Sequence, residues 1–266
     1  MSARHVHALL AAGVQDPRLI ASWQHEPERL LRLGVEPGSI DLDALWKFAG
    51  LTVKVRHNGL RDPLPLSFRL MNVAGLEIEV FAAYASFRAA DGAGFAPDTA
   101  GRIRDLIAFL ANWLNRTRPA HAMLWDLIRH EAALAELAQP PANVVARHAE
   151  LADRRISSSS IPKLRGELIL HEMQFDPAAV AAALRQSKPP LDAVPTRQRY
   201  VAYWRPDDGE EVCIVELDAF GHSVLSLVDE QRSLSDLAQT LCGKRKPGRR
   251  FLQLIGQLAD ARMLAF

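Results

Sequence analysis

Residues 211–241 read EVCIVELDAFGHSVLSLVDEQRSLSDLAQTL, and this stretch decides the fold of the C-terminal part of the chain. Its first seven residues, Glu211–Leu217, are rich in β-branched side chains and predict a strand. Side chains alternate along a strand, so this one has two faces: Cys213, Val215 and Leu217 on the first, and Val212, Ile214 and Glu216 on the second.

Helices are expected after this strand. Asp218 is a typical N-cap for a helix over Ala219–Val228. Ser233, with an aspartate three residues later, forms an acidic variant of the capping box and begins a helix that ends near Leu241. A third helix is expected at about Gly248–Met263.

Strands are expected before the same stretch. Arg199–Arg205 is rich in aromatic and β-branched residues, and Asp207-Asp208-Gly209 is a turn signal that pairs it with the strand after it. Leu164–Met173 also has strand character, and a short alanine-rich helix opens at Asp176–Pro177. Strands followed by three short helices predict a winged helix-turn-helix domain with a small antiparallel sheet.

The N-terminal half shows helical periodicity instead. Apolar residues recur at the spacing of one helix face over Ile103–Leu114 and again over Leu124–Leu137. Earlier helices are expected at about Pro17–Leu33, Asp41–Val55, Pro65–Met71 and Leu76–Arg88. The expected fold class is therefore α+β, with an all-helical domain over residues 1–138, a linker over 139–163 and the mixed domain over 164–266.

Composition excludes several classes of protein. The chain has 266 residues, of which 48% are hydrophobic and 24% charged, with a net charge of +1. These values are typical of a globular protein, and no stretch reaches the roughly 18 apolar residues that a membrane span needs. We expect a cytoplasmic protein with no membrane partner, and the near-zero net charge argues against a protein that coats nucleic acid.

The sequence lacks the usual signatures of catalysis. It contains only two cysteines, Cys213 and Cys242, and its nine histidines are scattered. No glycine-rich phosphate loop and no nucleophile motif is present. We therefore expect no catalytic residue, no metal site and no cofactor in this chain.

A basic cluster lies at the start of the expected third C-terminal helix. Helix N-termini attract anions, and the cations here would add to that attraction. The cluster could bind an acidic peptide or the DNA backbone, or it is simply a solvated loop. It consists of Lys244, Arg245, Lys246, Arg249 and Arg250.

The stretch Val215–Ala238 resembles the PqqD-like domain known as the RiPP recognition element, which binds precursor peptides in ribosomal peptide biosynthesis. Its pattern is a strand that ends in leucine, a capping residue, a helix with a leucine-rich end, an acidic turn and a second capped helix. The segment from Phe251 to Leu264 looks like the third helix of that family. The resemblance implies that a leader peptide adds as a strand to the small sheet and rests on the third helix.

The N-terminal half resembles the helical domain of partner proteins of multinuclear non-heme iron-dependent oxidases, such as those of methanobactin and 3-thiaglutamate biosynthesis. The residues that carry this likeness are 64–71 (LPLSFRLM), 79–84 (EVFAAY), Phe109-Leu110 and 127–133 (LIRHEAA). The resemblance implies that the iron belongs to a partner, a TIM-barrel oxidase subunit. It also implies a modified cysteine and, in the thiaglutamate case, excision of the β-carbon of a C-terminal cysteine.

These likenesses assign candidate residues to two sites. A glycine inside a helix costs about 1 kcal/mol relative to alanine, so Gly256 indicates close approach either of a bound peptide or of the chain's own strands. For the apolar residues in loops of the helical half, two interpretations stay open with equal weight: contact with the oxidase and packing in the protein core. The peptide-binding candidates are Val212, Ile214, Glu216, Arg249, Arg250, Leu252, Gln253 and Gly256; the partner-binding candidates are Leu60, Leu64, Phe68 and Phe95.

The expected function is thus that of a non-catalytic subunit that binds a precursor peptide and presents it to an iron oxidase. The alternative is a winged-helix transcription regulator, which would use the basic cluster on DNA.

Overall fold

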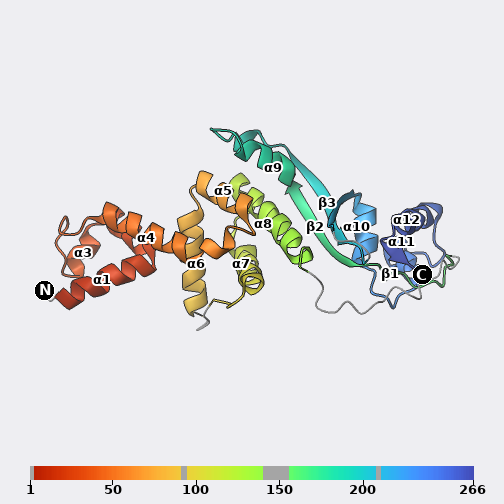
Figure 1. Cartoon of the computed structure of the whole chain (residues 1–266), viewed down its shortest axis with the longest axis horizontal. Helices are drawn as coiled ribbons and strands as arrows, with labels where there is room; N and C mark the ends of the chain where they lie inside the picture. The colour runs from red at the N-terminus through yellow and green to blue at the C-terminus, as the bar shows by residue number, and fades with distance from the viewer. Residues whose placement is uncertain (1–2, 91–94, 140–155, 208–210) are drawn as a thin grey trace. The chain divides into compact units, whose positions relative to one another are not determined.

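The computed structural model describes residues 3–90, 95–139, 156–207 and 211–266. The chain divides into two compact units, Met1–Ile128 with Ala183–Asp192, and Arg129–Ala182 with Ala193–Phe266. The fold is α+β, as expected, with a small antiparallel sheet in the second unit. Figure 1 shows the helices and strands of both units along the chain.

Every described element up to residue 137 is helical, as the sequence predicts. The helices of this part are α1 (Ala3–Gln15), α2 (Pro17–His25), α3 (Glu28–Arg32), α4 (Leu42–Arg56), the short 3₁₀ helix η1 (Asn58–Leu60), α5 (Pro65–Val73), α6 (Glu77–Ala90), α7 (Thr99–Trp113) and α8 (Pro119–Leu137).

Local signals explain where several of these helices begin. Asp41 caps α4 by accepting a hydrogen bond from the amide of Ala44 at 2.9 Å, and Asp98 caps α7 through Gly101 at 2.6 Å. The single helix expected over Pro17–Leu33 is wrong, because α2 ends at His25 and α3 begins after Pro27. Proline has no amide hydrogen to donate and clashes with the preceding turn, so it breaks a helix interior.

The helical unit is packed around aromatic side chains. Trp23 and Ile20 are buried in one cluster with Leu30. Farther along the chain, the rings of Phe68 and Phe81 stack with centroids 5.3 Å apart. These clusters bury the apolar faces whose periodicity predicts the helices.

The second unit is built on an antiparallel sheet in the order β2-β3-β4. Its strands are β2 (Glu167–Phe175), β3 (Thr196–Arg205) and β4 (Cys213–Leu217), and α9 (Pro177–Leu184) and the 3₁₀ helix η2 (Leu191–Ala193) lie between β2 and β3 in sequence. In the register of the last pair, Val201 lies opposite Glu216 and Tyr203 opposite Ile214. The turn expected at Asp207–Gly209 lies outside the described residues from position 208 onward.

The two faces of this sheet are covered differently. One face, which includes Leu168, Ala202 and Val215, packs on a helical core. That core is formed by α10 (Ala219–Ser226), α11 (Leu234–Cys242) and α12 (Arg249–Asp260), and Figure 1 shows these helices grouped beside the sheet. The other face, which includes Met173 and Tyr203, packs on Ala133 and Leu137 in the last turns of α8.

The expected helix caps of this unit are confirmed. Asp218 accepts a hydrogen bond from the amide of Gly221 at 2.6 Å. Ser233 and Asp236 form a reciprocal capping box at the start of α11. Gly243 then ends α11 in the left-handed conformation, at φ 68°, which glycine adopts without strain.

A short second sheet closes the unit. β1 (Lys163–Leu164) pairs with β5 (Leu264–Ala265) in antiparallel fashion. Most of the linker expected over 139–163 lies outside the described residues. Its described end is attached to α11, because the amides of Leu234 and Ser235 donate to the carbonyls of Ser160 and Ser158 at 2.9 and 2.8 Å.

Candidate functional site

β4 forms one edge of the three-stranded sheet. Within the described residues it pairs with β3 alone, over Cys213–Leu217. An edge strand presents a row of unpaired backbone donors and acceptors along its outer side. This edge can therefore accept an extended peptide as a further strand.

The predicted strand residues lie on the sheet face opposite the three helices. Val215 and Leu217 pack against the helical core, whereas Val212 packs with Met173 and Tyr203 on the α8 side. Ile214 and Glu216 share the face of Val212 because the pleat has a period of two. The side chains of Val212, Ile214 and Glu216 therefore lie on the face away from α12. A peptide at this edge would meet them on one face of the sheet and α12 on the other.

Glu216 is already engaged within the sheet. Its carboxylate accepts hydrogen bonds from Arg197 and Arg199, both at 2.6 Å. Arg199 also forms an ion pair with Asp176 at 3.0 Å. This network holds Glu216 on β3 and leaves Ile214, 52% exposed, as the open apolar side chain of β4.

α12 separates a buried from an open face. Phe251, Ile255 and Leu258 are buried in the helical core. The predicted residues lie on the other side of the helix, where Leu252 is 43% exposed and Gln253 is exposed. A half-exposed leucine at this place offers apolar surface to a partner.

Gly256 borders open space. A Cβ atom built at this position meets no atom within 4 Å. The interpretation of Gly256 as a residue packed against the chain's own strands is therefore wrong. Contact between Gly256 and a bound peptide stays a prediction.

The two arginines at the start of α12 differ in their contacts. Arg250 forms an ion pair with the capping residue Asp218 at 3.1 Å, and its guanidinium lies 5.4 Å from the centroid of the Phe220 ring. Arg249 is exposed and makes no ion pair within the described chain. The helix has Gly248 as its N-cap, without a side-chain hydrogen bond. Arg249 is therefore more available than Arg250 to an anionic group at this helix start.

The opposite face of the sheet is covered around Tyr203 by the protein's own side chains. His130 Nδ1 lies 2.8 Å from the Tyr203 hydroxyl, and the ring of His171 meets the Tyr203 ring edge-on at 5.5 Å. Burial, with the nearby Arg129 charge, lowers the pKa of His171 to about 4, and burial also lowers the pKa of His130. Burial thus favours the neutral form of both histidines, and each packs half-buried against Tyr203.

For three of the partner-binding candidates, the structure favours packing in the protein core over contact with the oxidase. Leu60 and Leu64 are fully buried and Phe68 is 2% exposed. Although they flank α5 in loop-like sequence, η1 and the first turn of α5 direct them into the core. Phe95 is half-buried, with its ring 5.2 Å from His57 and 5.4 Å from Tyr84. Core packing accounts for these side chains.

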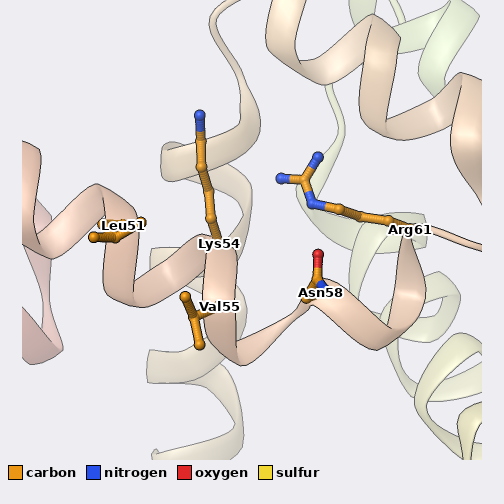
Figure 2. A pocket seen from close by; sticks show the side chains of 5 residues that line it. All are labelled: Leu51, Lys54, Val55, Asn58 and Arg61. Carbon is orange, nitrogen blue, oxygen red and sulfur yellow. The ribbon is translucent and has the colours of Figure 1, made fainter.

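A different apolar surface is exposed on the helical unit, and the sequence analysis missed it. Phe48, Leu51 and Val55 on α4 are 58%, 58% and 68% exposed. Leu51 and Val55 line a hollow of about 410 Å³ together with Lys54, Asn58 and Arg61 (Figure 2). We name Phe48, Leu51, Lys54, Val55 and Arg61 the α4 surface. The only signal in the sequence is helical spacing, which is equally typical of a buried face.

Two further properties of the described residues bear on function. No group of three or more histidine, cysteine, aspartate or glutamate side chains is placed to hold a metal ion. No single helix among them is long and apolar enough to cross a membrane, and the pair Pro65–Val73 and Glu77–Arg88 reaches that length only with a bend of 112°.

Comparison with known proteins adds no assignment. A scan against models of protein families finds no match, and a search among curated proteins finds no relative.

Proposed function

We propose that this chain is a non-catalytic subunit that binds a ribosomally made precursor peptide and presents it to a non-heme iron oxidase. The observation that carries the proposal is the outer edge of β4, which no described residue pairs with, in a sheet that packs on α10, α11 and α12. Strands followed by three helices support the interpretation of the second unit as a winged-helix, PqqD-like domain. The leader of the precursor pairs with the β4 edge by main-chain hydrogen bonds.

The exposed residues of α12 also support the binding of a leader peptide beside β4. Leu252 gives α12 an exposed apolar side chain with open space beside it at Gly256, and Arg249 supplies a cation that pairs with no described residue. A leader with apolar residues at alternate positions and an acidic residue near one end matches these groups. The helical unit binds the oxidase, a TIM-barrel subunit that carries the iron and the oxidation chemistry. The substrate is a cysteine of the precursor, and excision of its β-carbon is the reaction that the sequence resemblance implies.

Reconstitution with purified components tests this function. The components are this chain, a TIM-barrel iron oxidase of the kind that the resemblance implies and a precursor peptide that ends in cysteine, and the readout is the mass of the precursor. We expect modification only when both proteins are present, with iron in the oxidase and none in this chain after separation. Equal modification by the oxidase alone, or stoichiometric iron in this chain alone, contradicts the proposal.

A DNA-binding regulator is the second candidate, and the exposed cations at the start of α12 favour it. Lys244, Arg245 and Lys246 are all exposed. Binding of this kind falls steeply with salt, because condensed counterions are released from the duplex. Anisotropy of labelled duplex DNA separates the two functions, since the peptide-binding subunit shows no sequence-specific binding at physiological salt.

A further inference from the structure

The α4 surface combines apolar exposure with fixed positive charge. Phe48, Leu51 and Val55 follow the spacing i, i+3 and i+7, so they form one stripe about 10 Å long on the helix. The opposite side of α4, with Ala49 and Val53, is buried. A stripe of three large apolar side chains more than half exposed is unusual on a protein surface without a partner.

Cations border this stripe on one side. Lys47 and Lys54 are seven residues apart, so they lie along the same edge of α4, next to Leu51. Arg61 reaches the hollow from the turn after η1. Figure 2 shows its guanidinium directed toward the side of the hollow that holds Lys54.

The position of Arg61 is fixed by a buried carboxylate. Glu77, 4% exposed at the start of α6, forms ion pairs with Arg61 and, at 4.0 Å, with Lys54. One carboxylate thus faces two cations, which leaves an excess of one positive charge beside the apolar stripe. One oxygen of Glu77 has no hydrogen-bond partner within the described chain.

Basic residues continue into the neighbouring segment. Residues 41–77 contain five lysines and arginines and four acidic residues, but Asp41 caps α4 and Glu77 is buried in its ion pairs. Arg61 also borders a second hollow of about 360 Å³, lined by Phe68, Arg69 and Val73 among others. Positive charge therefore continues from α4 to α5, and a complementary partner is acidic.

Backbone chemistry decides the conformation of that partner. The α4 surface is made of helix and offers no strand edge, so an extended chain would gain no backbone ladder of hydrogen bonds there. A helix satisfies its backbone internally and can lay an apolar stripe against another stripe. We propose that the α4 surface is a docking site for an amphipathic helix of a partner protein with acidic residues beside its apolar face.

This inference rests on the proposed function only for the identity of the partner, which there is the oxidase. The chemistry of the site is tested separately with a designed probe. The probe is a synthetic 16-residue helical peptide with leucines on one face and glutamates beside them, labelled for fluorescence anisotropy. A control peptide has lysine in place of every glutamate.

Variants of the full-length chain locate the binding site. Leu51→Glu combined with Val55→Glu changes two exposed side chains and leaves the core intact. Leu31→Glu is the matched control, since Leu31 is 55% exposed on α3, outside the α4 surface. Circular dichroism and thermal melting verify that each variant is folded.

We expect the acidic peptide to bind the wild-type chain and the Leu31→Glu variant equally, and the double variant at least tenfold more weakly. Affinity should also fall as ionic strength rises. Equal binding of the acidic and basic peptides, or wild-type affinity in the double variant, overturns the inference.

The oxidase provides an independent arm of the test. Co-purification with the wild-type chain and loss of the complex in the double variant support docking at the α4 surface. A complex that survives in the double variant overturns this docking site and leaves the proposed function standing. Absence of any complex with the wild-type chain contradicts the proposed function, and the peptide titration then decides the docking site alone.

Discussion

Substitutions of Gly256 test two properties of this residue: the free energy that it costs α12 and the contact that it makes with a bound peptide. The residue lies inside α12 and a Cβ atom there meets nothing within 4 Å. Alanine stabilises a helix interior by about 1 kcal/mol relative to glycine. We therefore expect Gly256→Ala to raise the free energy of unfolding by up to that amount, which corresponds to roughly 2–4 °C in melting temperature for a chain of this size.

A larger side chain at the same position probes the path of the peptide. Leucine has nearly the helix propensity of alanine, so Gly256→Leu should also fold and be stable. Its side chain would occupy the open space beside Leu252. We expect the affinity for the precursor peptide, measured by titration calorimetry, to fall at least tenfold, equivalent to about 1.4 kcal/mol.

Gln239→Leu is the matched control for this experiment. It adds a leucine at an exposed position of α11, a helix that carries none of the peptide-binding candidates. The control should bind the precursor as the wild-type chain does. Destabilisation by Gly256→Ala refutes the open space at this position, and unchanged affinity in folded Gly256→Leu refutes the path of the peptide.

Three further experiments test the packing of the helical unit, the titration of His57 and the charge at the start of α12. Leu64→Ala should destabilise the chain by about 2–5 kcal/mol in denaturant titration, because the side chain is fully buried. Phe48→Ser, at an exposed position, should change the free energy of unfolding by less than about 0.5 kcal/mol. Similar values for the two variants would contradict the observed burial. Burial, with the Arg102 charge, lowers the pKa of His57 to about 3, so the unfolded chain takes up this proton first and stability is lost as pH falls from 6.5 toward 3. His57→Phe should flatten that dependence by up to about 1.4 kcal/mol per pH unit, and an unchanged slope in melts between pH 7 and 4 speaks against the assignment. Arg249→Glu with Arg250→Glu should weaken binding of the precursor at low salt and less so at high salt, and an effect independent of ionic strength would show that charge is not its cause.

Local signals in the sequence predict much of the second unit. The caps at Asp218 and Ser233 fix where α10 and α11 begin, since each satisfies backbone amides that no other group reaches. The alternation in Val212–Leu217 also predicts the two faces of β4 correctly. These features depend on residues close in sequence, and so one sequence is enough to predict them.

Features that depend on distant residues could not be predicted in the same way. The pairing of β1 with β5 joins segments about 100 residues apart and involves only two residues of each strand. Burial of Leu60 and Leu64 depends on how η1 and α5 pack on the rest of the helical unit. The exposed stripe on α4 has the spacing of a buried helix face, and only the packing of the whole unit shows that nothing described covers it.

The free edge of β4 is the centre of the proposed function, and amide hydrogen exchange measures it directly. The experiment compares the full-length chain alone with the chain saturated by the precursor peptide, whose binding is verified by calorimetry. The account predicts slower exchange in Cys213–Leu217 and in the first turns of α12, because an added strand bonds the outward-facing amides of β4 and covers the helix. Unchanged exchange over Cys213–Leu217 in the saturated complex, with protection at another part of the chain, would contradict it.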